Sequence, residues 1–221
     1  MTVILMLLMF SIFLVVDYFL RKKHAEVRPA KVKSGEAVAG LAPVVAGFRV
    51  PENLSYHPGH AWALRESPSL VRIGIDEFAS KLVGKIERLT LPQRGQWIRQ
   101  GQRFLTVFRD GKTAEMVSPI EGTVSDVNEA AIVDPEAARK DPYGQGWLLK
   151  VESPDAKTCF RNLLNGALAR SWMEEAARRL RVKMLVPAGA LAQDGGVAVD
   201  DVTAHLPGQA WTEVTKEFFL A

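Results

Sequence analysis

The chain has 221 residues, a net charge of +3 and a single cysteine, Cys159. One cysteine cannot form an intrachain disulfide, so the sequence excludes a disulfide-stabilised secreted scaffold and suits a reducing compartment. Basic residues cluster after an apolar N-terminus and lack an aromatic and basic recognition pattern, which favours attraction to anionic lipid headgroups and predicts no nucleic-acid partner.

Residues 1–23 predict one N-terminal transmembrane helix with a basic collar. Residues 3–20 are almost entirely apolar and would span about 27 Å as an α-helix, close to the hydrocarbon thickness of a bilayer. A cleavable signal peptide is the alternative, but no charged segment precedes the apolar run. Arg21, Lys22 and Lys23 follow it, so the positive-inside rule predicts a single-pass anchor in the inner (cytoplasmic) membrane, with the C-terminal domain in the cytoplasm.

Residues 24–50 are rich in Ala, Val, Gly and Pro and show no strong periodicity, so they predict a tether. Residues 51–180 predict the folded domain, because short apolar runs alternate there with Gly, Pro and Asp turns. This pattern is typical of a small all-β sandwich or barrel. The runs are 70–75, 104–108, 123–127 and 147–151. We expect Trp147, which enters the last run after a glycine-rich turn, to fill the barrel interior.

Helical patterns are fewer and lie mainly towards the C-terminus. Asp76 is placed to cap a short helix over 77–82, and Ser171 to start an amphipathic helix over 171–180. Residues 181–221 predict a C-terminal appendage with a strand at 183–186, a turn at 193–196 and a helix over 207–219. We expect this last helix to pack against the domain; docking to a partner is the alternative.

The segment 107–119 predicts a β-hairpin. Two strand-like runs flank Asp110-Gly111, and this dipeptide accepts the positive φ angles of a tight turn. Lys112 therefore lies at or near the tip, where a solvated turn lysine is the simplest interpretation.

The motifs around the hairpin resemble those of the glycine cleavage system H protein, a family of lipoyl carriers. They include His60-Ala-Trp62, the Ser118-Pro119-Ile-Glu-Gly122 run and the Asp141-Pro-Tyr-Gly-Gln-Gly-Trp147 run, and the resemblance covers roughly residues 52–180. It implies a mostly-β, lipoyl-domain-like barrel-sandwich hybrid with flanking helices. It also implies a non-catalytic protein that acts through protein partners.

The hairpin departs from this family at the residue that matters most. The resemblance places the lipoylated lysine seven positions before the residue that corresponds to Ser118, and Gly111 stands there. Phe108 stands at the position of the family's glutamate. Lys112, one place later, would project to the other face of a strand. We therefore expect no lipoate at the family position, and lipoate on Lys112 is the alternative.

Two functions follow from these patterns. The first is a membrane-tethered, H-protein-like interaction or scaffold module that has lost the cofactor and organises protein partners in a membrane or metabolic complex. The second is a working lipoyl carrier that uses Lys112 to shuttle aminomethyl or redox equivalents. The shift of the lysine and the loss of the glutamate favour the first.

The remaining reactive side chains do not form a recognisable catalytic or metal site in the sequence. The histidines, at 24, 57, 60 and 205, lack metal-ligand spacing. His60 is expected to have a packing and hydrogen-bonding role, and Cys159 to be an ordinary half-buried cysteine.

Overall fold

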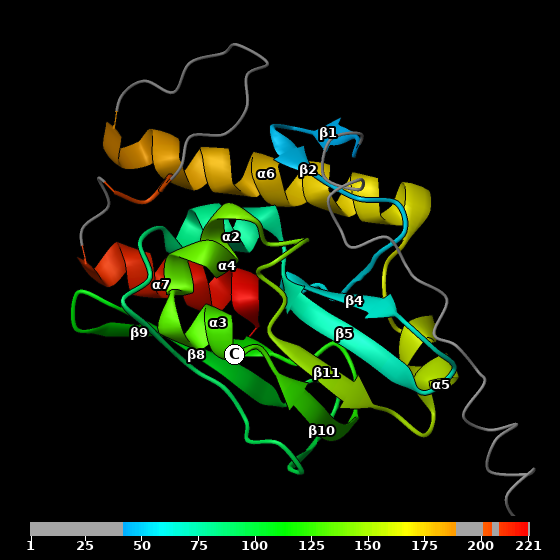
Figure 1. The fold of residues 1–221 in the computed structure, drawn as a ribbon. Helices are drawn as coiled ribbons and strands as arrows, with labels where there is room; N and C mark the ends of the chain where they lie inside the picture. Colours follow the sequence, from blue (N-terminus) through cyan, green and yellow to red (C-terminus); the bar gives the residue numbers. More distant parts are fainter. Residues whose placement is uncertain (1–41, 189–200, 205–207, 221) are drawn as a thin grey trace, which may run out of the picture. The chain divides into compact units, whose positions relative to one another are not determined.

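The computed structural model describes residues 42–188, 201–204 and 208–220, in which antiparallel strands form three sheets (Figure 1). The six-stranded sheet has the order β3 (Ser55–Tyr56), β4 (Ala61–Arg65), β5 (Leu70–Ile75), β11 (Leu149–Glu152), β10 (Gly122–Val127) and β7 (Trp97–Ile98). The three-stranded sheet has the order β6 (Arg88–Thr90), β8 (Arg103–Arg109) and β9 (Lys112–Val117). β1 (Val44–Val45) pairs with β2 (Phe48–Arg49). The mostly-β prediction is confirmed, and each predicted apolar run coincides or overlaps with a strand.

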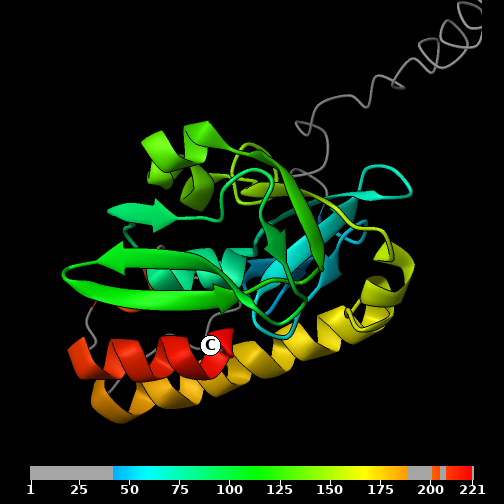
Figure 2. The same ribbon diagram turned by 90° about the horizontal axis from the view of Figure 1, so that it is seen from below.

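Helices border these sheets, and the two longest, α6 and α7, lie side by side (Figure 2). The helices are α2 (Glu77–Val83), α3 (Glu129–Val133), α4 (Pro135–Lys140), α5 (Ala156–Arg161), α6 (Gly166–Ala188) and α7 (Gly208–Phe219). Within the described ranges, no helix is both long and apolar enough to cross a bilayer. The predicted anchor, residues 1–23, lies outside those ranges.

Helix α2 begins where the sequence predicts. The Asp76 carboxylate accepts a hydrogen bond from the Ala79 N–H at 2.8 Å, which satisfies one of the donors left free in the first turn. Helix α7 likewise agrees with the predicted helix over 207–219, and it packs against the domain, as expected, through Trp211 and Phe218.

Three other predictions are wrong in part. Residues 183–186 continue α6 and do not form a strand, because Leu180 and Met184 extend one buried helical face at i, i+4 spacing. A short apolar run cannot by itself distinguish the two structures. The same helix begins at Gly166, before Ser171. At the other end, residues 44–49 of the predicted tether form the β1–β2 hairpin, whose Phe48 ring packs 5.0 Å from that of Phe78. The predicted turn at 193–196 lies outside the described residues.

The glycine-rich run before β11 is a structural junction. Its Pro142 carbonyl accepts a hydrogen bond from the indole of Trp62 at 2.9 Å, and the Trp62 ring is fully buried. The Tyr143 hydroxyl donates to the Arg49 carbonyl at 2.6 Å and accepts from the Glu77 N–H at 3.0 Å, so it joins β2 to α2. Burial raises the pKa of this hydroxyl well above its ordinary value, because ionisation would place an anion in the core. Through these contacts the run 141–147 ties β4, β2 and α2 together, so it has a structural role in this fold.

Trp147 does not fill the interior, contrary to expectation. Its ring is only half-buried, and the Arg72 guanidinium and the Lys150 ammonium lie 5.9 Å and 5.2 Å from its centre. Trp62 and Leu148 occupy the core there. Two successive residues of an extended chain face opposite sides, and Leu148 takes the inner side.

Candidate functional site at the β8–β9 hairpin

The hairpin closes in the tight turn that its sequence predicts. Asp110 and Gly111 have φ angles of +48° and +70°, which are the signs that a two-residue type I′ turn requires. Arg109 pairs directly with Lys112, so the two turn residues alone form the tip. The register is continuous from Leu105 to Lys112, and the irregularity in the ladder lies at the far end. No extra residue at the turn shifts the pairing of the two strands.

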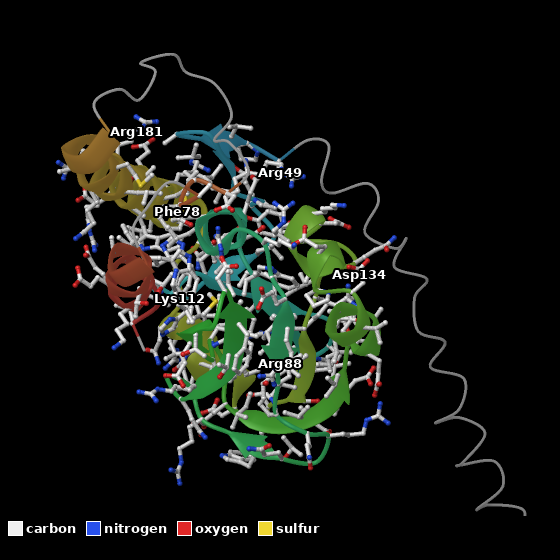
Figure 3. The ribbon with its side chains drawn as sticks, turned by 90° about the vertical axis from the view of Figure 1, so that its left-hand side faces the viewer. Arg49, Phe78, Arg88, Lys112, Asp134 and Arg181 are labelled. Carbon is white, nitrogen blue, oxygen red and sulfur yellow. The ribbon has the colours of Figure 1, made fainter. Side chains whose placement is uncertain are left out.

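The side chains of the hairpin divide between a closed and an open face. Ala114 and Met116 are buried on one face of β9, and Lys112 shares that face because side chains alternate along a strand. Lys112 is half-buried, and Figure 3 shows it beside α7. Gly111 lies at the tip, where an added β-carbon would meet no atom within 4 Å. The tip therefore has room for a side chain, whereas Lys112 belongs to the closed face.

Phe108, on the open face, is covered by an arginine. The guanidinium of Arg88 from the neighbouring strand lies 3.6 Å from the centre of the Phe108 ring. A planar cation over an aromatic face is stabilising. The position at which the family resemblance implies a glutamate thus holds an apolar ring in a cation–π contact, and it presents no carboxylate to a modifying enzyme.

Arg109 attaches the hairpin to the C-terminal segment. Its guanidinium makes two hydrogen bonds of 2.8 Å to the Asp201 carboxylate and a third, of 2.5 Å, to the Val83 carbonyl at the end of α2. The Thr203 hydroxyl donates to the Leu82 carbonyl at 2.9 Å, and the Val202 N–H donates to the Lys81 carbonyl at 3.2 Å. Three successive carbonyls at the end of α2 are therefore satisfied by residues from two distant segments. We call this set the α2 clamp.

Sequence reasoning did not identify the clamp. Asp201 lies 92 positions from Arg109, in a segment without periodicity. A lone aspartate in such a segment carries no signal of its partner. Gly84 is part of the same arrangement, because a β-carbon there would lie 2.2 Å from the Arg109 guanidinium.

Helix α7 covers the closed face, and it lies along β9 in Figure 2. The chain end of α7 reaches Gly59, where an added β-carbon would lie 2.8 Å from the Phe219 carbonyl oxygen and 3.2 Å from the Val117 side chain. The closed face is therefore shared by the hairpin, α2 and residues near the C-terminus.

The other candidate residues lie elsewhere in the domain. His60 is fully buried, and its Nδ1 lies 2.8 Å from the Asp76 carboxylate, in agreement with the expected packing and hydrogen-bonding role. His57 is half-buried; burial, with the nearby His60, lowers its pKa. Cys159 is buried, more completely than expected. His24 and His205 lie outside the described residues, within which no cluster of three His, Cys, Asp or Glu side chains could hold a metal ion.

Comparisons with known proteins identify one family. The sequence pattern of the Glycine cleavage H-protein family matches residues 54–176. The glycine cleavage system H protein of Anaeromyxobacter sp. (strain K) is 32% identical over 128 residues, which are 58% of this chain and 98% of that protein. The H protein of Nostoc punctiforme is 39% identical over 108 residues, 49% of this chain and 83% of that protein.

One solved structure also aligns with part of this chain. The crystal structure of a glycine cleavage system H protein from Mycobacterium marinum aligns with 55% of this chain and 97% of its own, at 28% identity and a TM-score of 0.49. The β1–β2 hairpin, the clamp residues 201–204 and helix α7 all lie outside the segment that the family pattern matches. The family pattern covers more than half of this chain, and the chain covers 98% of the Anaeromyxobacter relative. The chain therefore belongs to the glycine cleavage H-protein family.

Proposed function

We propose that this protein is a membrane-tethered, H-protein-like interaction module that carries no lipoate at the family position. The observation that carries the proposal is the tip of the hairpin, where Gly111 stands seven residues before Ser118. Glycine has no side chain to acylate. The uninterrupted register of the hairpin supports this alignment, since a shifted turn would be needed to bring Lys112 into the same place.

The contacts of the two residues before the turn support the same proposal. Arg88 occupies the face of Phe108, and the Arg109 guanidinium is held by Asp201. A swinging arm needs an attachment point that is free to leave the protein surface. Side chains held by several contacts around the turn serve a fixed surface better than a mobile one.

The second candidate is a lipoyl carrier through Lys112, shuttling aminomethyl or redox equivalents as in the glycine cleavage system. Its support is that Lys112 directly adjoins the turn and the chain belongs to the H-protein family. Against it, Lys112 shares a face with buried Ala114 and Met116, so an arm attached there would start on the side that α7 covers.

The mass of the intact protein, purified from its own host, tests the two candidates. We expect the unmodified mass for the wild type and no lipoyl adduct in a lipoyl-ligase reaction. A lipoyl amide that is present on Lys112 and absent from Lys112→Ala would show that the protein is a lipoyl carrier and would contradict the interaction module. This measurement needs no assumption about partners.

A gain-of-modification variant sharpens the test. Gly111→Lys with Phe108→Glu places a lysine and a glutamate at the family spacing, and the space around the tip admits the new side chain. The φ of +70° at this position costs a non-glycine residue about 1–2 kcal/mol, which the fold should tolerate. We expect ligase-dependent lipoylation of the double variant, with Phe108→Glu alone as the matched control. A folded double variant that stays unmodified would argue against Gly111 as the family position.

The membrane part of the proposal rests on residues 1–23. An apolar run followed by three basic residues supports a single-pass anchor in the inner membrane, with the domain in the cytoplasm. We expect the full chain in the membrane fraction and a chain without residues 1–23 in the soluble fraction. A truncated chain that still sediments with membranes would show that other residues bind lipid. Chemical crosslinking of the full chain in its own membranes, compared with the truncated chain, would then identify protein partners.

A further inference from the structure

A pocket of about 200 Å³ lies between α6 and α7. Its walls are apolar, with Trp172 and Ala176 from α6, Phe218 from α7 and Leu220 just after it. His60, Trp172 and Ala176 lie within the segment that matches the H-protein family, whereas helix α7 lies outside it, so the pocket joins the family segment to a part of the chain beyond it. The proposed interaction module does not assign it any role.

Charged side chains at the rim of the pocket neutralise one another. Glu217 accepts from Arg179 at 2.7 Å and lies 2.6 Å from the Lys183 ammonium, and Glu175 pairs with Arg178. Burial alone would raise the pKa of Glu217, but the hydrogen bonds from Lys183 and Arg179 lower it. Since the rim charges are already paired, the pocket favours a neutral ligand over an ion.

His60 is a polar residue of the pocket lining that makes no ion pair with the rim charges. One face of its ring stacks on Phe78 at 4.0 Å, Trp172 lies 4.6 Å away, and Nδ1 faces the Asp76 carboxylate. Phe78 is labelled in Figure 3, where it lies near α6 and α7. Asp76 is itself held by the Ala79 N–H. His60 lines the pocket, and because Nδ1 faces Asp76, Nε2 is the ring nitrogen left for a ligand.

The tautomer of His60 follows from these partners. A carboxylate can only accept a hydrogen bond, so Nδ1 carries a proton, and Nε2 has a free lone pair whenever the ring is neutral. In the described part of the chain, Nε2 has no hydrogen-bond partner. The backbone of His60 adopts φ +63°, an uncommon conformation for a residue other than glycine. A nearly buried acceptor is thus fixed by its surroundings and left unpaired at an apolar cavity.

We propose that this pocket binds a small neutral molecule consisting of one aromatic ring and a hydroxyl group, with the hydroxyl donating to Nε2 of His60. A cavity of about 150 Å³ lined by apolar side chains accommodates benzene, so this pocket has the volume for a ring with one short substituent. Aromatic walls match the ring, and the single acceptor matches the hydroxyl. The ligand would cover Trp172 and Phe218 together, and so tie α7 to α6.

Phenol and toluene are the probes that test this site. They have similar shape, but only phenol can donate to Nε2. We expect saturable binding of phenol to the full-length protein, and binding of toluene that is about fivefold weaker, the ratio that corresponds to one neutral hydrogen bond. The full-length protein is measured in detergent, which itself takes up both probes. Equilibrium dialysis sets the free concentration of each probe, and dialysis of detergent without protein gives the uptake to subtract. Equal affinities, or no saturable phenol binding, would overturn the proposal.

Two variants of α6 locate the binding. Ala176→Leu places extra carbons in the pocket, and Ala167→Leu makes the same change at an exposed position of the same helix. We expect the first to abolish phenol binding and the second to leave it unchanged. Phenol binding that survives in folded Ala176→Leu would contradict the assignment.

A measurement on the wild type does not depend on either variant folding. The ¹⁵N resonance of His60 Nε2 should shift on addition of phenol and stay in place with toluene. An Nε2 chemical shift that stays unchanged at saturating phenol would show that Nε2 does not accept a hydrogen bond from the ligand. Neither outcome depends on the state of Lys112, so failure here and failure of the proposed interaction module are distinguishable.

Discussion

The segment that matches the H-protein family and the C-terminal segment that follows it contribute in different ways to one surface. Residues 54–176 supply the hairpin and its tight turn, whereas residues 201–204 and α7 cover the face that the hairpin leaves apolar. A family match therefore predicts the hairpin without predicting what lies against it. The closed face of this hairpin is covered partly by α2, within the family segment, and partly by α7, which the family pattern does not include.

Removing α7 should have the largest effect on this arrangement. Trp211, Val214, Phe218 and Phe219 are buried, and burial of each such side chain contributes about 1.5–3 kcal/mol. A chain that ends at residue 207 should thus lose about 5 kcal/mol or more of unfolding free energy, a large share of the roughly 5–15 kcal/mol that is typical of a folded domain. Circular dichroism during denaturation, with the chain lacking residues 1–23 as control, measures it. A cooperative transition at the control midpoint would show that α7 is an independent appendage.

Breaking the α2 clamp should cost less. Arg109→Ala removes charge-assisted hydrogen bonds to Asp201 and to the Val83 carbonyl, and it leaves Asp201 with only the contact from the Thr203 hydroxyl at 3.2 Å. We expect a loss of about 2–3 kcal/mol of unfolding free energy, measured by urea titration. Lys112→Ala, directly across the hairpin, is the matched control and should change it by less than about 0.5 kcal/mol. Similar losses in both variants would mean that the clamp is not specific to Arg109.

Truncating the half-buried tryptophan should have a smaller effect, within the family segment itself. Trp147→Ala removes a half-buried ring that contacts Arg72 and Lys150, and we expect a loss of about 1 kcal/mol. Trp62→Ala, which empties a fully buried site, should cost about 3–5 kcal/mol in the same assay. Equal losses in the two variants would show that Trp147 contributes to the core as much as Trp62 does.

The smallest expected effect is a pH dependence at the contact between the two segments. His57 lies beside Gly59, which α7 reaches, and burial lowers the pKa of His57 below its ordinary value. The unfolded chain then binds more protons than the folded chain, so this contribution is present above about pH 6.5 and is lost as the pH falls through the folded pKa. Melting temperatures from pH 7.5 to 5.0 should fall less in His57→Gln than in the wild type. Parallel curves would assign the acid sensitivity to other groups.

Local patterns predicted much of the fold because they depend on neighbouring residues. The Asp110-Gly111 turn, the Asp76 cap and the strand at 70–75 follow from backbone preferences and alternation within a few positions. The error at residues 183–186 arose where a short apolar run fits two periodicities. The error at Trp147 arose because alternation leaves open which of two adjacent apolar residues faces inward.

The sequence by itself determined the domain type, the tight turn and the identity of the residue at its tip, because each depends on order along the chain. The tertiary structure alone decided which face of the hairpin is closed, what holds Arg109, and how His60 meets a pocket between two helices. Those features join residues more than 90 positions apart, such as Arg109 and Asp201, and no local preference specifies such a pairing. They arise when burial of apolar surface brings distant segments together and every buried polar group must then find a partner.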